Sequence, residues 1–241
     1  MDTILKDILV IDIETASAAK QMSGLSKGLQ EHWIKKASFL RNEDNLTPEE
    51  LYDKKAAIYA EFGKVIVISV GIFYEKKGKD LGLRIKSFYG HNEQKLLQEF
   101  KDFLHGRFKQ DKLRFCAHNG KEFDYPYLCR RMLVNGIKIP PALDLSGKKP
   151  WEVQHLDTME MWKFGDRKSF TSLDLMASAL GVKSSKSEID GSMVNEIYYN
   201  DQEGLEKIAY YCRGDVIATA QVYLRLRGID LIKEQNIIIV A

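Results

Sequence analysis

Short, continuous runs of aliphatic and β-branched residues mark the first strands along the chain. Ile8-Leu9-Val10-Ile11 lies within a predicted strand over residues 6–14, and the run VIVISVGI predicts a second strand at 65–72. A third strand is predicted at 83–89, joined to the second by a turn at 77–80. Runs of this kind are typical of strands in a buried sheet. We therefore expect these three strands to form a meander.

Apolar residues spaced three or four apart predict the helices. The clearest apolar stripes lie on residues 92–108 and on the longest predicted helix, residues 205–227. The other predicted elements are strands at 113–117 and 153–156, a helix that follows a turn at 118–120 and ends near Val134, and a helix at 173–180. Three strands followed by alternating helices and strands predict an α/β fold, in which helices flank a mixed five-stranded sheet.

A long polar stretch, residues 16–63, separates the first two predicted strands. It contains one clear helix start, in which Thr47 is the cap, Pro48 is the first helical residue and Glu50 completes a capping box. No repeat or change in composition divides the chain. We therefore interpret residues 1–241 as a single domain with 16–63 as an insertion.

Composition narrows the class of protein. The chain has 241 residues, of which 44% are hydrophobic and 29% charged, and its formal net charge is only +2. Any surface that binds nucleic acid must therefore be local. Three scattered cysteines are too few for a disulfide framework or a cysteine zinc site, which fits a reducing compartment. No signal-peptide pattern opens the sequence, and no apolar run approaches the ~20 residues of a membrane span. These features predict a cytoplasmic protein with no membrane segment.

Two carboxylates, Asp12 and Glu14, stand at the end of the first predicted strand. Because side chains alternate along a strand, both project from the same face. Their repulsion at about 4 Å costs ~4 kcal/mol at an effective dielectric of 20. A divalent cation would turn this cost into binding energy, and carboxylate oxygens suit Mg²⁺ or Mn²⁺. Roughly one D-x-E motif arises by chance in a chain this long, so its place at the carboxyl end of a buried strand is what makes it informative.

Two later motifs each contribute one aspartate. Asp124 ends the motif N-x-x-x-F-D and precedes Tyr125-Pro126, so taken alone it is favoured as a cap of the helix that Pro126 begins. Asp215 follows Tyr211 by four residues at one margin of the stripe on the last helix, and taken alone this pair is an amphipathic border. Each motif is weak by itself. Together, in this order and on elements that can face a common point, the three motifs are specific.

At these residues the sequence resembles the DEDD superfamily of 3′→5′ exonucleases, in its tyrosine-bearing DEDDy branch. Within that branch it is most similar to exonucleases related to the proofreading domain of family B DNA polymerases. Further matching stretches lie at residues 155–160, 172–175, 180–182, 189–192 and 211–226. The resemblance covers most of the chain from residue 6 to about 227. It covers little of the insertion and does not reach residues 229–241.

The resemblance implies an RNase H-like fold and hydrolysis of single-stranded nucleic acid from its 3′ end with two Mg²⁺ or Mn²⁺ ions. Asp12, Glu14 and Asp215 would hold the ion that activates the attacking water. Asp12 would also bridge to the second ion, which Asp124 would support. Tyr211 would orient the water, because a phenol with a pKa near 10 is a poor base at neutral pH. The resemblance favours DNA over RNA, and any proofreading would serve a polymerase or repair partner in trans.

Six side chains are candidate substrate contacts: Asn119, Phe123, Trp33, Lys35, Lys36 and Arg41. The first two belong to the motif that ends at Asp124. The other four lie in the insertion, where the three cations form a candidate phosphate track and the tryptophan a candidate stacking platform. The alternative for this basic stretch is an ordinary solvated face.

Two other classes of function remain open. One is a nucleic-acid-binding module of the same fold without catalytic activity, against which the four acids and Tyr211 argue. The other is an unrelated α/β protein whose acids are helix caps and surface charges. An α/β protein that binds a nucleotide cofactor is not supported, because no G-x-G-x-x-G follows the first strand and no G-K-[ST] occurs. His118 is assigned a structural role in its turn. Asp157 is interpreted equally as a helix cap and as a carboxylate behind the site.

Overall fold

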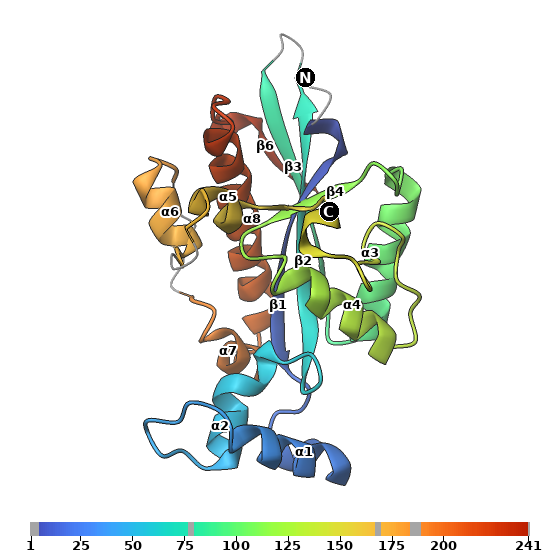
Figure 1. Ribbon diagram of the computed structural model, residues 1–241, viewed down its shortest axis with the longest axis vertical. Helices are drawn as coiled ribbons and strands as arrows, with labels where there is room; N and C mark the ends of the chain where they lie inside the picture. Colours follow the sequence, from blue (N-terminus) through green and yellow to red (C-terminus); the bar gives the residue numbers. More distant parts are fainter. Residues whose placement is uncertain (1–4, 77–79, 167–169, 184–188, 241) are drawn as a thin grey trace.

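The strands of the structure are β1 (Ile8–Ser17), β2 (Gly63–Glu75), β3 (Leu81–Tyr89), β4 (Arg114–Ala117), β5 (Leu156–Asp157) and β6 (Ile237–Val240). They form one sheet in the order β5-β4-β1-β2-β3-β6 (Figure 1). β1, β2 and β3 pair antiparallel, which confirms the predicted meander. β4 runs parallel to β1, β5 parallel to β4, and β6 parallel to β3. The computed structural model describes residues 5–76, 80–166, 170–183 and 189–240, so the predicted turn at 77–80 lies outside it except for Asp80.

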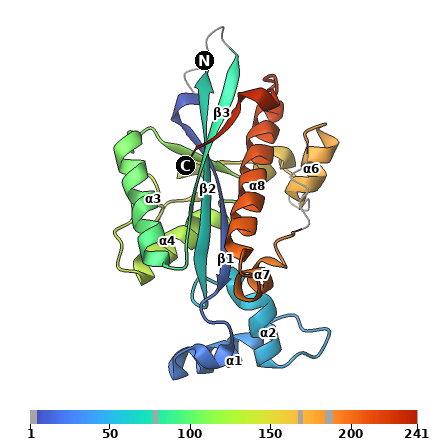
Figure 2. The same cartoon turned by 180° about the vertical axis from the view of Figure 1, so that it is seen from behind.

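Helices cover both faces of this sheet (Figures 1 and 2). They are α1 (Lys27–Ala37), α2 (Pro48–Lys55), α3 (Glu93–Arg107), α4 (Asp124–Val134), α5 (Thr158–Lys163), α6 (Leu173–Ala179), α7 (Val194–Asn200) and α8 (Gly204–Leu226). α3 and α4 lie on one face, and α8, with α5, α6 and α7 beside it, lies on the other. α1 and α2 form a lobe beyond the end of β1, here called the α1–α2 lobe, residues 18–62. No helix in the described ranges is both long and apolar enough to cross a lipid bilayer.

The alternation of side chains along β1 fixes what each face of the strand contacts. Leu9, Ile11 and Ile13 point into the main hydrophobic core, which β1 shares with α3 and α4. Ile8 and Val10 point the other way and pack against α8. The strand is therefore buried on both faces, as its sequence predicts, and Asp12 and Glu14 continue the face that α8 covers.

Several predicted elements differ from those in the structure. The sheet has six strands rather than five, because the tail that the resemblance did not reach forms β6 at the sheet edge. The strand predicted at 153–156 is wrong in position: a 3-10 turn occupies Pro150–Glu152, and β5 is only Leu156–Asp157. β1 ends three residues later than predicted, at Ser17.

The start of α2 was predicted from the sequence, whereas three other helices were not. The capping box at the start of α2 is confirmed, with Thr47 Oγ1 accepting from the Glu50 N–H at 3.3 Å and Glu50 Oε2 accepting from the Thr47 N–H at 2.7 Å. The sequence analysis did not predict α1, α5 and α7. α5 and α7 have six and seven residues. Isolated helices of this length are marginal in water, so packing against the rest of the protein has to hold them.

Candidate active site

Asp12 and Glu14 interrupt an otherwise apolar contact between β1 and α8. On one side of them Val10 belongs to an apolar cluster with Val216 of α8, and on the other side Ala16 belongs to a cluster with Ile208 and Ala209 of α8. The Cys212 thiol donates to Asp12 Oδ2 at 3.1 Å. Ligand atoms of Asp12, Glu14 and Cys212 all lie within 4.8 Å of one another. The strand and the helix thus enclose a small polar group within their interface.

Asp124 reaches this group from the other side of the sheet. The pairing of β4 with β1 ends at Val10, so the N–H of Ile13 lies beyond it. Asp124 Oδ1 accepts that hydrogen bond at 3.1 Å. Asp124 is the first residue of α4, and the cap position belongs to Phe123, which makes no side-chain cap. The interpretation of Asp124 as a helix cap is therefore wrong. Its carboxylate accepts from β1 instead, beyond the point where β4 stops pairing with that strand.

A tight turn between β4 and α4 places Asp124 there. Asn119 adopts a left-handed conformation with φ of 61°. At Gly120 an added Cβ would lie 2.4 Å from the Cβ of Ala117, so no larger residue fits. Asp157 accepts from the N–H groups of Asn119 and Lys121 at 3.0 and 3.1 Å. The turn is thereby held against the end of β5.

Asp157 and His118 have structural roles. Besides fixing the turn, Asp157 is the N-cap of α5 and accepts from the Met159 N–H at 3.0 Å, which confirms the cap interpretation. His118 contacts Thr158 Oγ1 through Nδ1 and the Thr171 carbonyl through Nε2, both at 2.9 Å. Both ring nitrogens therefore have protein partners, as the structural assignment predicts.

α8 supplies Tyr211 and Asp215. Both side chains are half-buried, and the four-residue spacing places them on one side of the helix. Burial raises the pKa of Tyr211 well above its ordinary value, and the negative charges of Asp215 and Glu14 and a hydrogen bond to Asp215 raise it further. The phenol therefore stays protonated beside the acids and can orient a water molecule by hydrogen bonding.

The four acids act on one another electrostatically. Burial raises the pKa of Asp12 and of Glu14 well above the ordinary range, and the charges of the other acids add to both shifts. Burial also raises the pKa of Asp124 to about 7, with Asp157 and Asp215 contributing. Asp124 and Asp215 lie outside the 4.8 Å group, yet both influence its members. The four carboxyls proposed from sequence thus face a common region.

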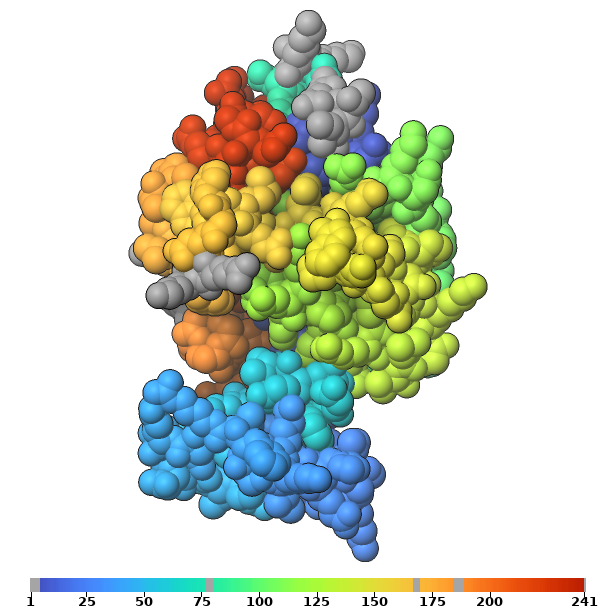
Figure 3. Space-filling model, viewed as in Figure 1, coloured from blue at the N-terminus to red at the C-terminus, as the bar shows by residue number. Residues whose placement is uncertain are grey.

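Three of these carboxyls lack a cationic partner among the described residues. Within the described ranges, no Lys or Arg forms an ion pair with Asp12, Glu14 or Asp124. Buried carboxylates normally require such a partner or remain protonated. A donor set of carboxylate oxygens suits a hard divalent cation. The residues present therefore fit a metal site. On the face of the molecule drawn in Figure 3, a hollow lies between α4 (green) and α7 (orange).

The six candidate substrate contacts lie in two places in the structure: two precede α4 and four lie in the α1–α2 lobe. Asn119 Oδ1 is buried and has no hydrogen-bond partner among the described residues. The half-buried ring of Phe123 packs 5.3 Å from that of Tyr127. Both residues lie beside Asp124, and their contact with substrate stays a prediction.

The stacking role expected of Trp33 is wrong. Its side chain is 0% exposed in the core of the α1–α2 lobe, and its indole N–H donates to the Pro48 carbonyl at 2.7 Å. Among the cations, Lys35 is exposed, Lys36 lies 3.9 Å above the ring of Tyr59, and Arg41 pairs with Glu43. The phosphate track stays a prediction, now without its aromatic platform.

Cys212 is the residue beside the acids that the sequence analysis missed. It lies in the apolar stripe of α8 and was assigned to the core, where its 0% exposure indeed places it. Its position next to Tyr211 was the only available signal. The contact with Asp12 joins residues 200 apart in the chain, so helix spacing alone cannot reveal it.

Comparisons with known proteins agree with this geometry. A family model described as a predicted 3′-5′ exonuclease related to the exonuclease domain of PolB matches residues 58–235, a span that starts after Asp12 and Glu14. The structure is similar to that of the family B DNA polymerase from the hyperthermophilic archaeon Pyrobaculum calidifontis, with a TM-score of 0.56 and 16% sequence identity. The match covers 90% of this chain and 24% of the polymerase chain, and at this identity it shows the fold alone, which confirms the RNase H-like prediction. No curated protein matches the sequence.

Proposed function

Because the chain belongs to the family of predicted 3′-5′ exonucleases related to the exonuclease domain of PolB, we propose that it hydrolyses single-stranded nucleic acid from the 3′ end with two divalent cations. One observation carries the proposal: Asp12, Glu14, Asp124 and Asp215 come together from β1, α4 and α8, and no Lys or Arg among the described residues forms an ion pair with the first three. The likeness to a DNA polymerase favours DNA over RNA as the substrate.

The four acids would share the ligand roles. Asp12, Glu14 and Asp215 would hold one Mg²⁺ or Mn²⁺ ion, and Asp12 with Asp124 would hold the second. Two ions in such a site stabilise the attacking and the leaving oxygen of an in-line displacement at phosphorus. Burial and mutual repulsion raise the pKa values of Asp12, Glu14 and Asp124, so these carboxyls favour protons, for which a cation would substitute.

Other groups of the chain would position the acids and the water. The thiol of Cys212 holds Asp12 Oδ2, and the Ile13 N–H holds Asp124 Oδ1. These two hydrogen bonds fix the directions in which the carboxylates present their remaining oxygens. Tyr211, protonated at neutral pH, would hold the attacking water by its hydroxyl rather than remove a proton from it.

A 5′-labelled single-stranded DNA oligomer tests the proposal directly. With Mg²⁺ or Mn²⁺ we expect a ladder of shortened products and release of nucleoside 5′-monophosphates, whereas EDTA stops the reaction. A circular single strand lacks a 3′ end and survives; rapid cutting of the circle would mean an endonuclease. A protein that binds the oligomer but gives no ladder with either metal is the inactive binding module. An RNA oligomer of the same sequence decides the sugar preference.

We also propose that residues 1–241 act as one domain, with residues 16–63 as its insertion. Three hydrogen bonds support this by joining the α1–α2 lobe to the helices around the sheet. Tyr127 Oη donates to the Ala57 carbonyl at 2.7 Å, Arg131 to that of Ala60 at 2.8 Å and Asn195 to that of Asp53 at 2.9 Å. A single cooperative thermal transition is expected, and two separate transitions would contradict it. A cytoplasmic location and a polymerase or repair partner in trans complete the proposal.

A further inference from the structure

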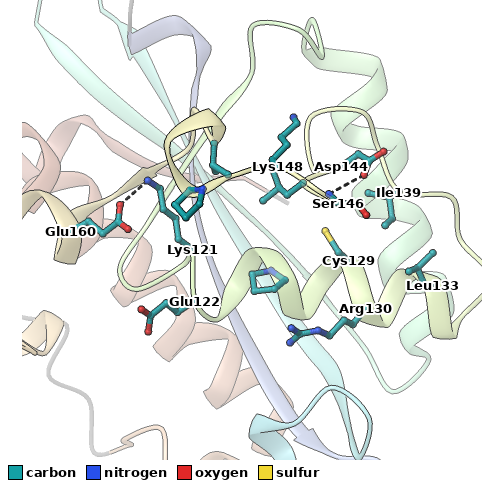
Figure 4. A pocket seen from close by; sticks show the side chains of 14 residues that line it. Lys121, Glu122, Cys129, Arg130, Leu133, Ile139, Asp144, Ser146, Lys148 and Glu160 are labelled. Atoms are coloured by element: carbon teal, nitrogen blue, oxygen red, sulfur yellow. Dashed lines mark hydrogen bonds and ion pairs between the residues drawn. The ribbon is translucent and has the colours of Figure 1, made fainter. Parts of the chain in front are cut away.

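A pocket of about 630 Å³ lies on the outer side of α4, close to the acids but with none of them in its lining (Figure 4). Its walls are the outer face of α4 and the segment 139–153 that follows this helix. Apolar side chains such as Leu133, Ile139 and Leu145 form much of the lining. Ile139 and Leu145 also pack against the main core, so this part of the wall is held in place. The volume is in the usual range for a small-ligand site.

α4 connects this pocket to the acids. Asp124 begins the helix and faces β1, whereas Pro126, Arg130 and Leu133 face the pocket. Glu122, at the rim, is two residues before Asp124. From Asp124 to Leu133 the helix rises about 14 Å at 1.5 Å per residue, a span of a few nucleotides. A strand whose 3′ end lies at the acids reaches the pocket within that length.

The charges of the pocket favour a ligand with both an anionic group and hydrogen-bond donors. Its cations are Lys121, Arg130 and Lys148, and its acids are Glu122, Asp144 and Glu160. Lys121 pairs with Glu160 at 2.7 Å (Figure 4). Arg130 has no ion-pair partner in the described part of the chain. A lining of balanced charge does not bind a ligand by net charge alone, so recognition there also needs hydrogen bonds and apolar contact. It suits a nucleotide, which offers a phosphate to Arg130, base N–H groups to the acids and a flat base to the apolar wall.

An exposed tryptophan borders the pocket. Trp151 is 78% exposed, and its neighbours Pro150 and Val153 line the pocket. The ammonium of Lys149 stands 5.3 Å from the centre of its indole ring. An exposed aromatic face beside a cation is the combination on which single-stranded nucleic acids stack. Packing within the protein does not account for the exposure of Trp151, whereas Trp33 is fully buried.

We propose that the α4 pocket and Trp151 form a subsite for nucleotides of a single strand that lie on the 5′ side of the end held at the acids. Arg130 contacts a phosphate, one base lies against the apolar wall, and a further base stacks on Trp151. The direction of the strand rests on the proposed function, but binding at the subsite does not. A protein segment in this pocket is the competing occupant, and the test below separates the two.

Binding is measured in EDTA, where no hydrolysis is expected, with unlabelled oligothymidylates of 3 and 12 nucleotides. The 12-mer should quench tryptophan fluorescence and bind more tightly than the 3-mer. Trp151→Ala should remove the quenching and weaken 12-mer binding about tenfold, within the range for loss of one stacked base. Arg130→Ala should weaken it and lower the salt slope by about one phosphate contact. Arg107→Ala, which removes an exposed cation at the end of α3, should change neither.

The same proteins are then given Mg²⁺ to separate the two proposals. Hydrolysis without quenching, and with equal affinity for both oligomers, overturns the subsite and leaves the exonuclease proposal standing. Quenching and length dependence without hydrolysis in Mg²⁺ or Mn²⁺ support the subsite and overturn the exonuclease. A Trp151→Ala protein that binds the 12-mer like wild type, with an unchanged circular dichroism spectrum, also overturns the subsite and leaves the pocket to a protein segment.

Discussion

Two groups of buried carboxylates, one around Glu93 and one where β1, α4 and α8 meet, are balanced in opposite ways. On the α3–α4 face, Glu93 accepts from Val65 N at 2.7 Å, from Arg131 Nε at 2.9 Å and from Asn135 Nδ2 at 2.9 Å, and a second guanidinium nitrogen of Arg131 completes the pair. In the acidic cluster, by contrast, Asp12, Glu14 and Asp124 have no such cation within the described ranges. Glu93 and Asp124 are nevertheless about equally buried, at 8% and 4% exposure.

A buried carboxylate that supports the fold has a cationic partner, whereas buried carboxylates without one are candidates for a functional site. Glu93 and Arg131 join α3, α4 and β2, and every lone pair or N–H used by the pair replaces a hydrogen bond to water. Burial and mutual repulsion oppose the ionisation of the acidic cluster, so we expect the cluster to lower the stability of the protein. Perturbed carboxyls of this kind are typical of functional sites. Four predictions test whether the two groups differ in this way.

Loss of a cluster carboxylate should have the largest effect, and on activity alone. Asp215→Ala removes a proposed metal ligand, so we expect the rate of nucleotide release to fall about a thousandfold or more, equivalent to ~4 kcal/mol. The free energy of unfolding should change little. The matched control is Asp111→Ala, which removes an exposed aspartate and should keep wild-type activity. Near-normal hydrolysis by the Asp215→Ala protein would contradict the shared metal site.

Loss of the Glu93 partner should affect stability instead. Arg131→Met leaves a buried carboxylate without its cation, so the free energy of unfolding should fall by about 3–5 kcal/mol. Urea denaturation measures the loss. A second change, Glu93→Gln, should restore part of it, because the unpaired charge is then gone. If Arg131→Met is as stable as wild type, the pair is not the structural support proposed here.

The pH dependence of stability without metal should reveal the cluster. A carboxyl whose pKa is raised in the folded protein binds more protons there than in the unfolded chain, so stability falls as pH rises. For Asp124 the fall begins above the ordinary pKa of 3.8 and is complete above about 7. In EDTA the free energy of unfolding should therefore be lower at pH 8 than at pH 5, by an amount on the order of a few kcal/mol. Thermal melts at the two pH values measure this as a lower melting temperature at pH 8.

Two comparisons sharpen this third prediction. Mg²⁺ should restore stability at pH 8 by binding the ionised acids. Asp12→Asn removes one of the repelling charges, so in EDTA the variant should be as stable as wild type or more stable, and Mg²⁺ should stabilise it less. A variant that melts well below wild type in EDTA, with an equal gain from Mg²⁺, would speak against a cluster.

Tyr211→Phe should have the smallest effect. In the proposed mechanism the hydroxyl orients water but holds no ion, so its loss should lower the single-turnover rate about ten- to a hundredfold, or ~1.4–2.7 kcal/mol. Stability should remain close to that of wild type, since the aromatic ring is retained. The measurement is single-turnover hydrolysis at saturating Mg²⁺. Full activity in this variant would make Tyr211 a packing residue.

Much of the fold was predictable because it depends on local pattern. The meander, the capping box of α2 and the long helix α8 all follow from runs and spacings within the chain. The errors have a common cause. β6, and the true position of β5, depend on pairing with β3 and β4, which lie far away in the sequence. The four acids and Tyr211 were proposed from sequence, and their convergence was an inference from order and resemblance.

The sequence by itself determined the residue types and their local geometry. Strand alternation places Asp12 and Glu14 on one face, and helical spacing places Tyr211 beside Asp215, because backbone periodicity fixes both. Only the tertiary structure decided what these side chains meet. Asp124 accepts from a backbone N–H 111 residues away, and Cys212 donates to a carboxylate 200 residues away. The burial of Trp33 and the exposure of Trp151 were decided in the same way. Burial and charge balance are set by all the elements that pack around a residue, and no window of sequence contains them.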